Sequence, residues 1–256
     1  MPNPVHAHIP YPQLRNNLEL VLQRNHNLEV MFTSDALDAM VPEELSSIAG
    51  MLAARGLRTT IHAPFMDLNP GAFDPLVRKA TLHRFHQVLD AASILKPVVV
   101  VFHPGYDKWR FGESQDRWLH GSTQTFREVL DRAVEIGCIV AVENIFEEEP
   151  STLKALLEEI DSPMFRHCFD IGHWNMFKKV GMREWFDELG GFIAEAHIHD
   201  NHGKKDEHLP LGEGAIDFDL FFSMLRSHAP DAVCTIEAHS IERLDRALVN
   251  IGKYIP

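Results

Sequence analysis

Six short apolar stretches of this 256-residue chain end on a histidine or an acid, the residue types that bind metal ions. Each stretch has the length of a β-strand. In chain order, the residues at their ends are His62, His103, Glu143, Asp170, His197 and Glu237. One polar residue at the end of one strand is common. The repetition over the whole chain is what constrains the fold, because it requires an architecture that gathers the ends of many strands at one place.

Apolar runs, including two without such an end residue, predict eight β-strands: residues 5–9, 28–32, 58–62, 98–103, 139–143, 165–170, 192–197 and 232–237. Helical patterns separate them, with start signals such as Asp74 followed by Pro75, and Asp217. Strands that alternate with helices imply a parallel sheet with right-handed crossovers. The length is close to the roughly 250 residues of a typical eightfold barrel. We therefore expect an α/β fold in which residues 1–256 form a single-domain (β/α)8 TIM barrel.

The charge balance bears on the kind of partner. Lys and Arg number 24 and Asp and Glu number 37, which gives a formal net charge of −13. Such a surface repels polyphosphate unless basic residues are concentrated in one stripe, and no such stripe is evident. The sequence therefore favours a small-molecule substrate and argues against DNA.

Three sequence features bear on cellular location. The amino-terminal residues carry neither a basic region nor an apolar region of the signal-peptide type. The strongly apolar stretches are far shorter than the ~20 residues of a membrane helix. The three cysteines form no CxxC pair, which is typical of buried, reduced thiols. We expect a cytoplasmic protein with no membrane partner. The sequence leaves a homo-oligomer open.

The predicted barrel brings the strand-end residues together, because the last residues of each strand face the same mouth. Two further pairs belong with them. Asp170 and His173 are three residues apart at the start of a helix, and Asp206 and His208 are two apart in an extended segment, so each pair shares a face. The predicted ligands are His62, His103, Glu143, Asp170, His173, His197, Asp206, His208 and Glu237. Imidazole and carboxylate suit Zn²⁺, Mn²⁺, Fe²⁺ or Co²⁺, and nine ligands suit two or three divalent ions per chain.

Substrate contacts are expected close to these ligands. Residues 104–119 form the longest connection, and they follow the fourth strand at the predicted mouth. The connection is rich in aromatic residues, including Trp109, and long loops of this kind often cover substrates. A surface excursion without function explains it equally well. His199 lies near the ligands in the sequence and is a second candidate for substrate binding.

The strand-end motifs resemble those of the xylose isomerase-like TIM-barrel superfamily, which includes sugar (phosphate) isomerases and epimerases and the endonuclease IV family. The resemblance covers nearly the whole chain in strand order. It rests on His62-Ala63-Pro64, His103-Pro104-Gly105, Glu143-Asn144, Asp170 with His173, His197 with Asp200, and Glu237. The endonuclease IV group adds a D-x-H pair before a GEG turn. Asp206-Glu207-His208 before Gly212-Glu213-Gly214 resembles that arrangement.

The resemblance implies roles for individual residues. Glu143 and Glu237 resemble the paired catalytic glutamates of the epimerases, one of which removes a proton that the other returns. His173 resembles the contact of that family with a substrate hydroxyl. The chain departs from the endonuclease pattern at His199, where that pattern has Asn, and it shows no long basic DNA-binding loop.

Three functions remain in view. The first is a metal-dependent isomerase or epimerase acting on a small sugar or sugar phosphate by proton transfer at a carbonyl. The second is an endonuclease IV-like phosphoester hydrolase of the abasic-site type with several metal ions, which the complete ligand set favours. The third is a barrel that binds metal or sugar without catalysis.

Overall fold

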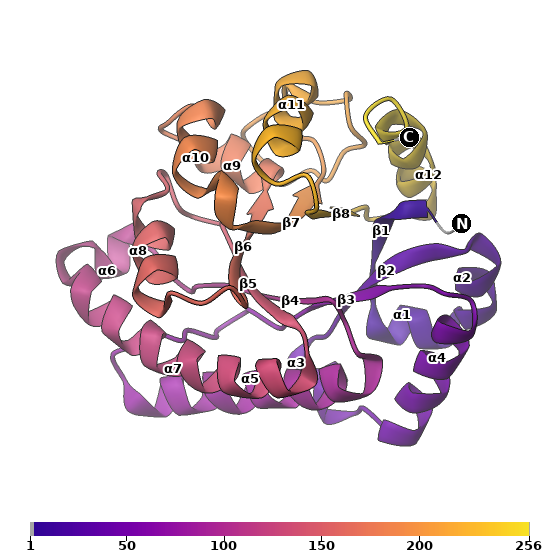
Figure 1. The fold of residues 1–256 in the computed structure, drawn as a ribbon, viewed down its shortest axis with the longest axis horizontal. Coiled ribbons are helices and arrows are strands. Elements are labelled where there is room, and N and C mark those ends of the chain that lie inside the picture. Colours follow the sequence, from indigo (N-terminus) through magenta and orange to yellow (C-terminus); the bar gives the residue numbers. More distant parts are fainter. Residues whose placement is uncertain (1–2, 256) are drawn as a thin grey trace.

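Eight parallel strands close into one barrel, as the sequence predicts (Figure 1). The computed structural model describes residues 3–255. The strands pair in chain order, and the eighth returns to the first. Their bounds, all within two residues of the predicted ones, are β1 Asn3–Pro10, β2 His26–Met31, β3 Thr59–His62, β4 Val99–Phe102, β5 Ile139–Glu143, β6 Phe165–Asp170, β7 Ile193–Ile198 and β8 Val233–Ile236. The prediction of an α/β single-domain (β/α)8 barrel is confirmed.

Helices surround the barrel on its outer face (Figure 1). Two of the predicted start signals are helix caps in the structure. The side chain of Asp74 accepts from the backbone N–H of Leu76 at the start of the helix Pro75–Leu95, and that of Asp217 accepts from Leu220 at the start of the helix Phe218–His228. The helices are α1 Tyr11–Asn16, α2 Leu18–Arg24, α3 Ser34–Asp38, α4 Pro42–Ala54, α5 Pro75–Leu95, α6 Lys108–Phe111, α7 Gln115–Ile136, α8 Ser151–Ile160, α9 Ile171–Phe177, α10 Met182–Leu189, α11 Phe218–His228 and α12 Ile241–Ile251. Two short 3₁₀ turns are η1 Gly112–Ser114 and η2 Gly190–Phe192.

Two different interiors result from the alternation of side chains along each strand. Residues that face outward pack against the helices and form a large aromatic core that includes Phe85, Phe102, Phe126, Phe169 and Trp185. Residues that face the axis form a small apolar cluster of Val99, Val101, Ala141 and Cys168. The interior also holds buried polar side chains, those of His6, Glu29, Thr60, Glu195 and Thr235. The barrel axis below the strand ends is therefore lined partly by apolar and partly by polar residues.

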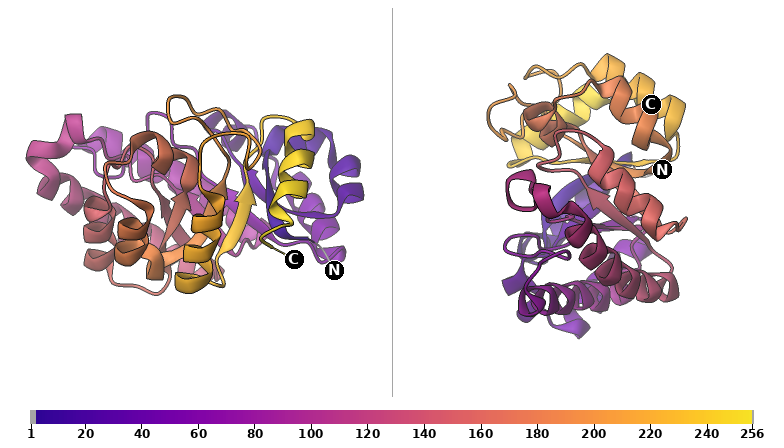
Figure 2. Two further views of the ribbon diagram at one scale, coloured as in Figure 1. Left: turned by 90° about the horizontal axis from the view of Figure 1, so that it is seen from above. Right: turned by 90° about the vertical axis from the view of Figure 1, so that its left-hand side faces the viewer.

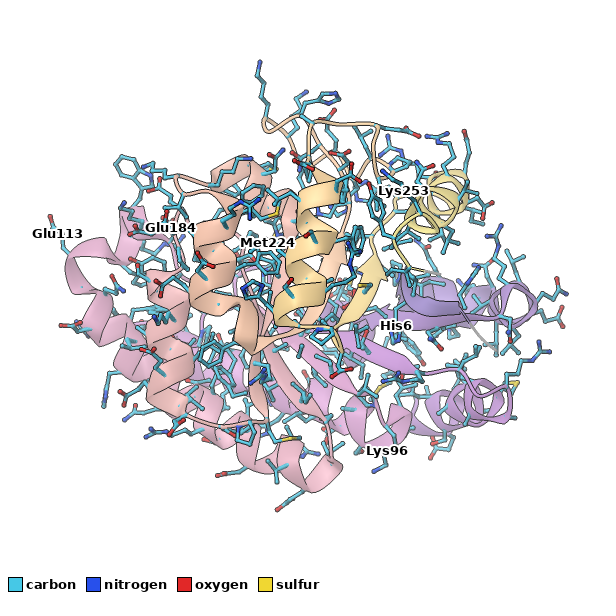
Figure 3. All side chains as sticks on the ribbon, turned by 45° about the horizontal axis from the view of Figure 1, so that its top comes forward. His6, Lys96, Glu113, Glu184, Met224 and Lys253 are labelled. Carbon is cyan, nitrogen blue, oxygen red and sulfur yellow. The ribbon has the colours of Figure 1, made fainter. Side chains whose placement is uncertain are left out.

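The segment after β4 differs from the expected loop. Part of residues 104–119 is helical, since α6 and η1 occupy its middle and α7 already begins at Gln115. Tyr106, Phe111 and Trp118 are buried in the core, and Asp107 caps α6 by accepting from the N–H of Trp109. Apolar packing and the Asp107 cap thus order this segment, although its many charged residues are typical of a loop. Figure 3 shows Glu113, which follows α6, at the outer edge of the molecule.

The start of β1 and the end of α12 lie close together, and the segment between β7 and α11 lies on the opposite side (Figure 2). The three cysteines are buried and unpaired, as expected. Among the described residues, none of the helices combines the length and apolar character needed to cross a membrane.

Candidate metal centre

The alternation of strand residues places the six predicted ligands at strand ends around one end of the barrel axis. Each of these six ligands stands two residues beyond a residue that faces the axis, and residues two apart in a strand share a face. The pairs are Thr60 with His62, Val101 with His103, Ala141 with Glu143, Cys168 with Asp170, Glu195 with His197, and Thr235 with Glu237. The convergence of these side chains follows from strand register alone.

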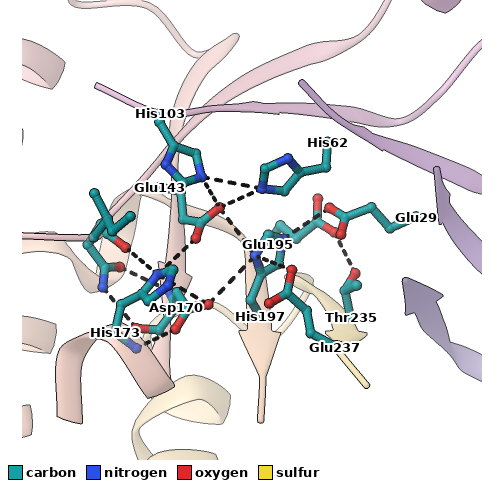
Figure 4. Close-up of polar contacts among 12 residues, drawn as sticks. Glu29, His62, His103, Glu143, Asp170, His173, Glu195, His197, Thr235 and Glu237 are labelled. Carbon is teal, nitrogen blue, oxygen red and sulfur yellow. Dashed lines mark hydrogen bonds and ion pairs between the residues drawn. The ribbon is translucent and has the colours of Figure 1, made fainter. Parts of the chain in front are cut away.

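The first group of ligands surrounds one nitrogen of His197. Its Nδ1 lies 3.3 Å from Glu143 Oε2, 3.4 Å from Glu237 Oε1 and 3.9 Å from Asp170 Oδ2 (Figure 4). All four side chains are at least nine-tenths buried. Four donors so close together make a compact set of one imidazole and three carboxylates.

The second group lies on the other side of Glu143. The Nε2 atoms of His62 and His103 each lie 3.2 Å from Glu143 Oε2, and they are 3.3 Å from one another. His62 Nδ1 donates to the carbonyl oxygen of Ala63 at 2.8 Å, so the ring presents Nε2 to the group. Glu143 therefore contacts the first and second groups with the same oxygen, the position of a bridging carboxylate.

The third group is built on the segment between β7 and α11. His208 Nε2 lies 2.9 Å from Asp206 Oδ2, and His208 Nδ1 lies 3.6 Å from Glu237 Oε2. His173 Nε2 reaches Asp206 Oδ2 at 3.6 Å. The ring of His199 stacks on that of His208, with centroids 4.0 Å apart and planes 5° apart.

Asp200 holds this segment in place. Its carboxylate accepts from the backbone N–H groups of Gly212, Gly214, Ile216 and Asn201. A Cβ on Gly214 would lie 2.3 Å from Asp200 Oδ1, so only glycine allows this approach. The resemblance implied a role in metal binding for Asp200, and the structure gives its carboxylate a different set of partners. Four amide donors occupy its oxygens, and its carboxylate orders the turn that positions Asp206 and His208.

A second carboxylate and an amide position His173. Asp170 Oδ1 accepts from the backbone N–H of His173 at 2.6 Å and so caps α9. The Asn144 amide exchanges two hydrogen bonds with the backbone of Asp170, and His173 Nδ1 lies 3.1 Å from the Asn144 carbonyl oxygen. The neighbouring Gly172 has no room for a side chain, because a Cβ there would lie 1.9 Å from the ring of His199.

Sequence reasoning missed two buried acids beneath the ligands. Glu29 Oε2 lies 3.0 Å from His197 Nε2, and Glu29 Oε1 lies 2.8 Å from His8 Nδ1. Glu195 accepts from the hydroxyls of Thr60 and Thr235. Each acid stands inside an apolar strand run at the register that faces the axis. A charged residue in the middle of such a run was the signal that could have revealed them.

Burial and opposite charges oppose each other in setting the pKa values of the cluster. Burial raises the pKa of Glu143, but the charges of His103 and His197 outweigh it and hold that pKa well below its usual range. The pKa of Glu237 is lowered in the same way, by His197 and His8. Burial opposes the charged form of His62, yet its hydrogen bond to Glu143 raises the pKa to about 9. Burial dominates at His103 and lowers its pKa.

The residues present fit divalent metal ions. The Nδ1 atoms of His197, His199 and His208 are buried without any hydrogen-bond partner. Their carboxylate neighbours lie 3.3 to 3.9 Å away, about the separation of two donors that each stand ~2.0–2.2 Å from one ion. Triads with close donor atoms include His62 with Glu143 and His197, and His199 with His208 and Glu237. An unpartnered nitrogen facing an acid is the arrangement that a bound cation completes.

The structure thus brings all nine predicted ligands into one cluster, although their binding of metal remains a proposal. His199, expected to contact substrate, is fully buried and lies 3.1 Å from Asp170 Oδ2, so it belongs to the ligand cluster. Trp109, also expected to contact substrate, does not join the cluster. Its side chain is 97% exposed on α6.

A family model described as a xylose isomerase-like TIM barrel matches residues 25–250. The chain belongs to the xylose isomerase-like TIM barrel family. The chain is 28% identical to the uncharacterized protein MJ1311 of Methanocaldococcus jannaschii, over 94% of this chain and 85% of that protein.

Two further comparisons represent the two enzyme classes. A solved structure of a D-tagatose 3-epimerase-like protein is 26% identical, with a TM-score of 0.83 over 98% of this chain and 97% of that one. A probable endonuclease 4 of Mycobacterium leprae is 25% identical over 74% of this chain and 77% of that protein. The epimerase-like protein is thus similar along nearly the whole chain, and the endonuclease along about three quarters of it.

Proposed function

We propose that this protein is a divalent-metal-dependent isomerase or epimerase that acts on a small sugar or related polyhydroxy carbonyl compound. The observation that carries the proposal is the placement of Glu143 and Glu237 on opposite sides of His197 Nδ1, at 3.3 and 3.4 Å (Figure 4). Glu143 ends β5 and Glu237 directly follows β8, and these two strands are separated by two others in the closed barrel. A substrate bound at this point has one carboxylate on each face.

Two carboxylates in this arrangement can exchange a proton with carbon. A bound ion would polarise the carbonyl and stabilise the charge that develops when the neighbouring C–H proton leaves. The carboxylate on one face removes that proton, and the group on the other face, after taking up a proton from water, delivers it to the carbon. The lowered pKa of both glutamates supplies the ionised base at neutral pH. His173, whose Nε2 lies 3.6 Å from Asp206 Oδ2, would orient a substrate hydroxyl.

The complete second group favours a different reaction. His62 and His103 converge on one oxygen of Glu143, so this carboxylate has the geometry of a bridge between two ions. Paired ions can hold a phosphate and generate hydroxide at neutral pH, which is the chemistry of phosphoester hydrolysis. The similarity to endonuclease 4 agrees with this second candidate. The net charge of −13 makes a small phosphoester a better substrate for it than DNA.

Solvent proton exchange distinguishes the candidates. Protein loaded with Mn²⁺ or Co²⁺ would be incubated with a panel of ketoses and aldoses in D₂O, and deuterium at carbon followed by NMR. We expect exchange beside the carbonyl, reduced about 10²- to 10⁴-fold by Glu143→Gln or Glu237→Gln. Glu135→Gln, on the exposed face of α7, is the matched control.

Each alternative has its own result in this experiment. Hydrolysis of bis(4-nitrophenyl) phosphate without any carbon exchange supports the phosphoesterase. Binding of sugar and metal without either reaction supports the non-catalytic barrel. In that case the parent protein has no turnover, and Glu143→Gln cannot reduce it.

A further inference from the structure

A cavity of about 720 Å³ opens beside the metal cluster, between the segments that follow β3, β4 and β5. This volume lies within the roughly 300–1,000 Å³ of small-molecule sites. Its lining is mainly apolar, and the larger side chains are Phe65, Leu68, Phe73, Phe111, Ile145 and Phe146. Phe146 is 48% exposed at its rim and Met66 is 75% exposed, which is an unusual placement for such side chains unless a ligand covers them.

The cavity is continuous with the metal cluster through one ligand. His103 lines the cavity and also lies 3.2 Å from Glu143 Oε2. The ring of Phe65 stacks on His103, with centroids 4.3 Å apart and planes 11° apart. A molecule bound at Glu143 therefore needs only to extend past the His103 and Phe65 rings to enter an apolar space.

The charges around the cavity disfavour a phosphate. Three carboxylates line it, those of Asp67, Asp74 and Asp107, against the single guanidinium of Arg110. Asp74 and Asp107 accept from backbone N–H groups at the starts of α5 and α6, so their charges are fixed in place. An anionic group in this space would meet a net negative surrounding.

We propose that this cavity binds the apolar end of the substrate, so that the substrate is a hydroxy-carbonyl compound with a hydrophobic substituent, aryl or branched alkyl, and not a sugar phosphate. The inference rests on the proposed function, because the metal cluster anchors the polar end. The cavity adds a second determinant of substrate specificity. The metal cluster selects the chelating groups of the substrate, and the cavity selects its apolar substituent.

Hydroxamates test this assignment, because the hydroxamate group chelates divalent ions whatever it is attached to. Isothermal titration of the Mn²⁺-loaded protein would compare acetohydroxamate, 4-phenylbutanohydroxamate and a hydroxamate of similar length that ends in a phosphonate. We expect the phenyl compound to bind at least tenfold more tightly than acetohydroxamate, and the phosphonate no more tightly than acetohydroxamate.

Variants on one helix locate the effect. Val77 lines the cavity and is 41% exposed, whereas the adjacent Leu76 is 75% exposed and does not line it. Val77→Asp should abolish the advantage of the phenyl compound, and Leu76→Asp should retain it. Phe146→Ser, at the exposed rim, should reduce it without relying on the same helix.

The outcomes separate this inference from the proposed function. Equal affinity for the phenyl and acetyl compounds would overturn the cavity assignment and leave the metal centre intact. Tighter binding of the phosphonate would overturn it in favour of an anionic substituent. Failure of every hydroxamate to bind would remove the metal anchor, and with it both proposals.

Discussion

Glu29 fixes which nitrogen of His197 faces the ligand cluster. Glu29 Oε2 lies 3.0 Å from His197 Nε2 in the closed interior of the barrel, where both side chains are fully buried. Burial raises the pKa of Glu29, but the charges and hydrogen bonds of His197 and His8 hold it well below its usual range, so the carboxylate accepts and Nε2 donates. The lone pair of Nδ1 is then the one available to an ion beside Glu143 and Glu237. Carboxylate, imidazole and metal ion in this order form a common triad in metal sites.

Replacing Glu29 with Gln should therefore weaken metal binding without removing a ligand. The amide keeps the shape of the side chain but loses the charge that orients the imidazole and increases its basicity. We expect about a 10- to 100-fold loss of affinity, measured by titration of the metal-free protein with Zn²⁺. Glu135→Gln serves as the control. An unchanged affinity in Glu29→Gln would show that His197 is oriented by its other contacts.

Alanine at His62 or His103 should remove one ion and spare another. The group around His197 Nδ1 keeps all four of its side chains in either variant, whereas the second group loses one of its two imidazoles. Metal analysis of protein purified without chelator should show one equivalent less than the parent. The exposed His120 supplies the control substitution. If both variants retain the parental metal content, the proposal of several ions is wrong.

Glu147 should make stability depend on pH. It is buried near the cluster with Oε2 accepting from the N–H of Ile145 and Oε1 without a partner, and burial raises its pKa to about 7. The folded state therefore holds a proton that the unfolded state releases near its ordinary pKa of about 4.5. This difference costs stability progressively as pH rises from about 4.5 to 7, and the loss is complete above 7, at roughly 3 kcal/mol.

A neutral side chain at position 147 removes this cost. Glu147→Gln should raise the free energy of unfolding by up to about 3 kcal/mol at pH 8 and by little below pH 5, as measured by urea denaturation. The exposed Glu149, changed in the same way, should give no such pH-dependent difference. An equal effect of Glu147→Gln at pH 5 and pH 8 would contradict the role of charge.

Gly172→Ala should damage both packing and the third ligand group. A Cβ would lie 1.9 Å from the fully buried His199 ring, which cannot move away without leaving Asp170. We expect a loss of about 1–3 kcal/mol in unfolding free energy together with lower metal content. A Cβ on Gly50 in α4 would meet nothing within 4 Å, so Gly50→Ala should instead stabilise the protein by about 0.5–1 kcal/mol. Similar losses in the two variants would contradict the proposed steric cause.

The sequence was sufficient to predict the strands because each is a short apolar run, and six of the eight end on a histidine or an acid, a pattern visible without tertiary contacts. It also predicted that the residues at these ends converge, since parallel register in a closed barrel brings the strand ends together. The roles that it could not predict depend on tertiary packing. Asp200 has the spacing of a ligand, but three of the four amides that donate to it lie 12 to 16 residues away. Glu29 gains its role only when β2 lies across the barrel from β7.

The order of the ligands along the chain has a consequence for synthesis of the protein. The ligands run from His62 on β3 to Glu237 beyond β8, and β8 must pair with β1 before the barrel is closed. A growing chain on the ribosome thus exposes the histidines of the second group long before it contains Glu237. All nine proposed ligands are present only after the last strand has been made, so metal ions bound by the whole set would be acquired after translation of nearly the whole barrel.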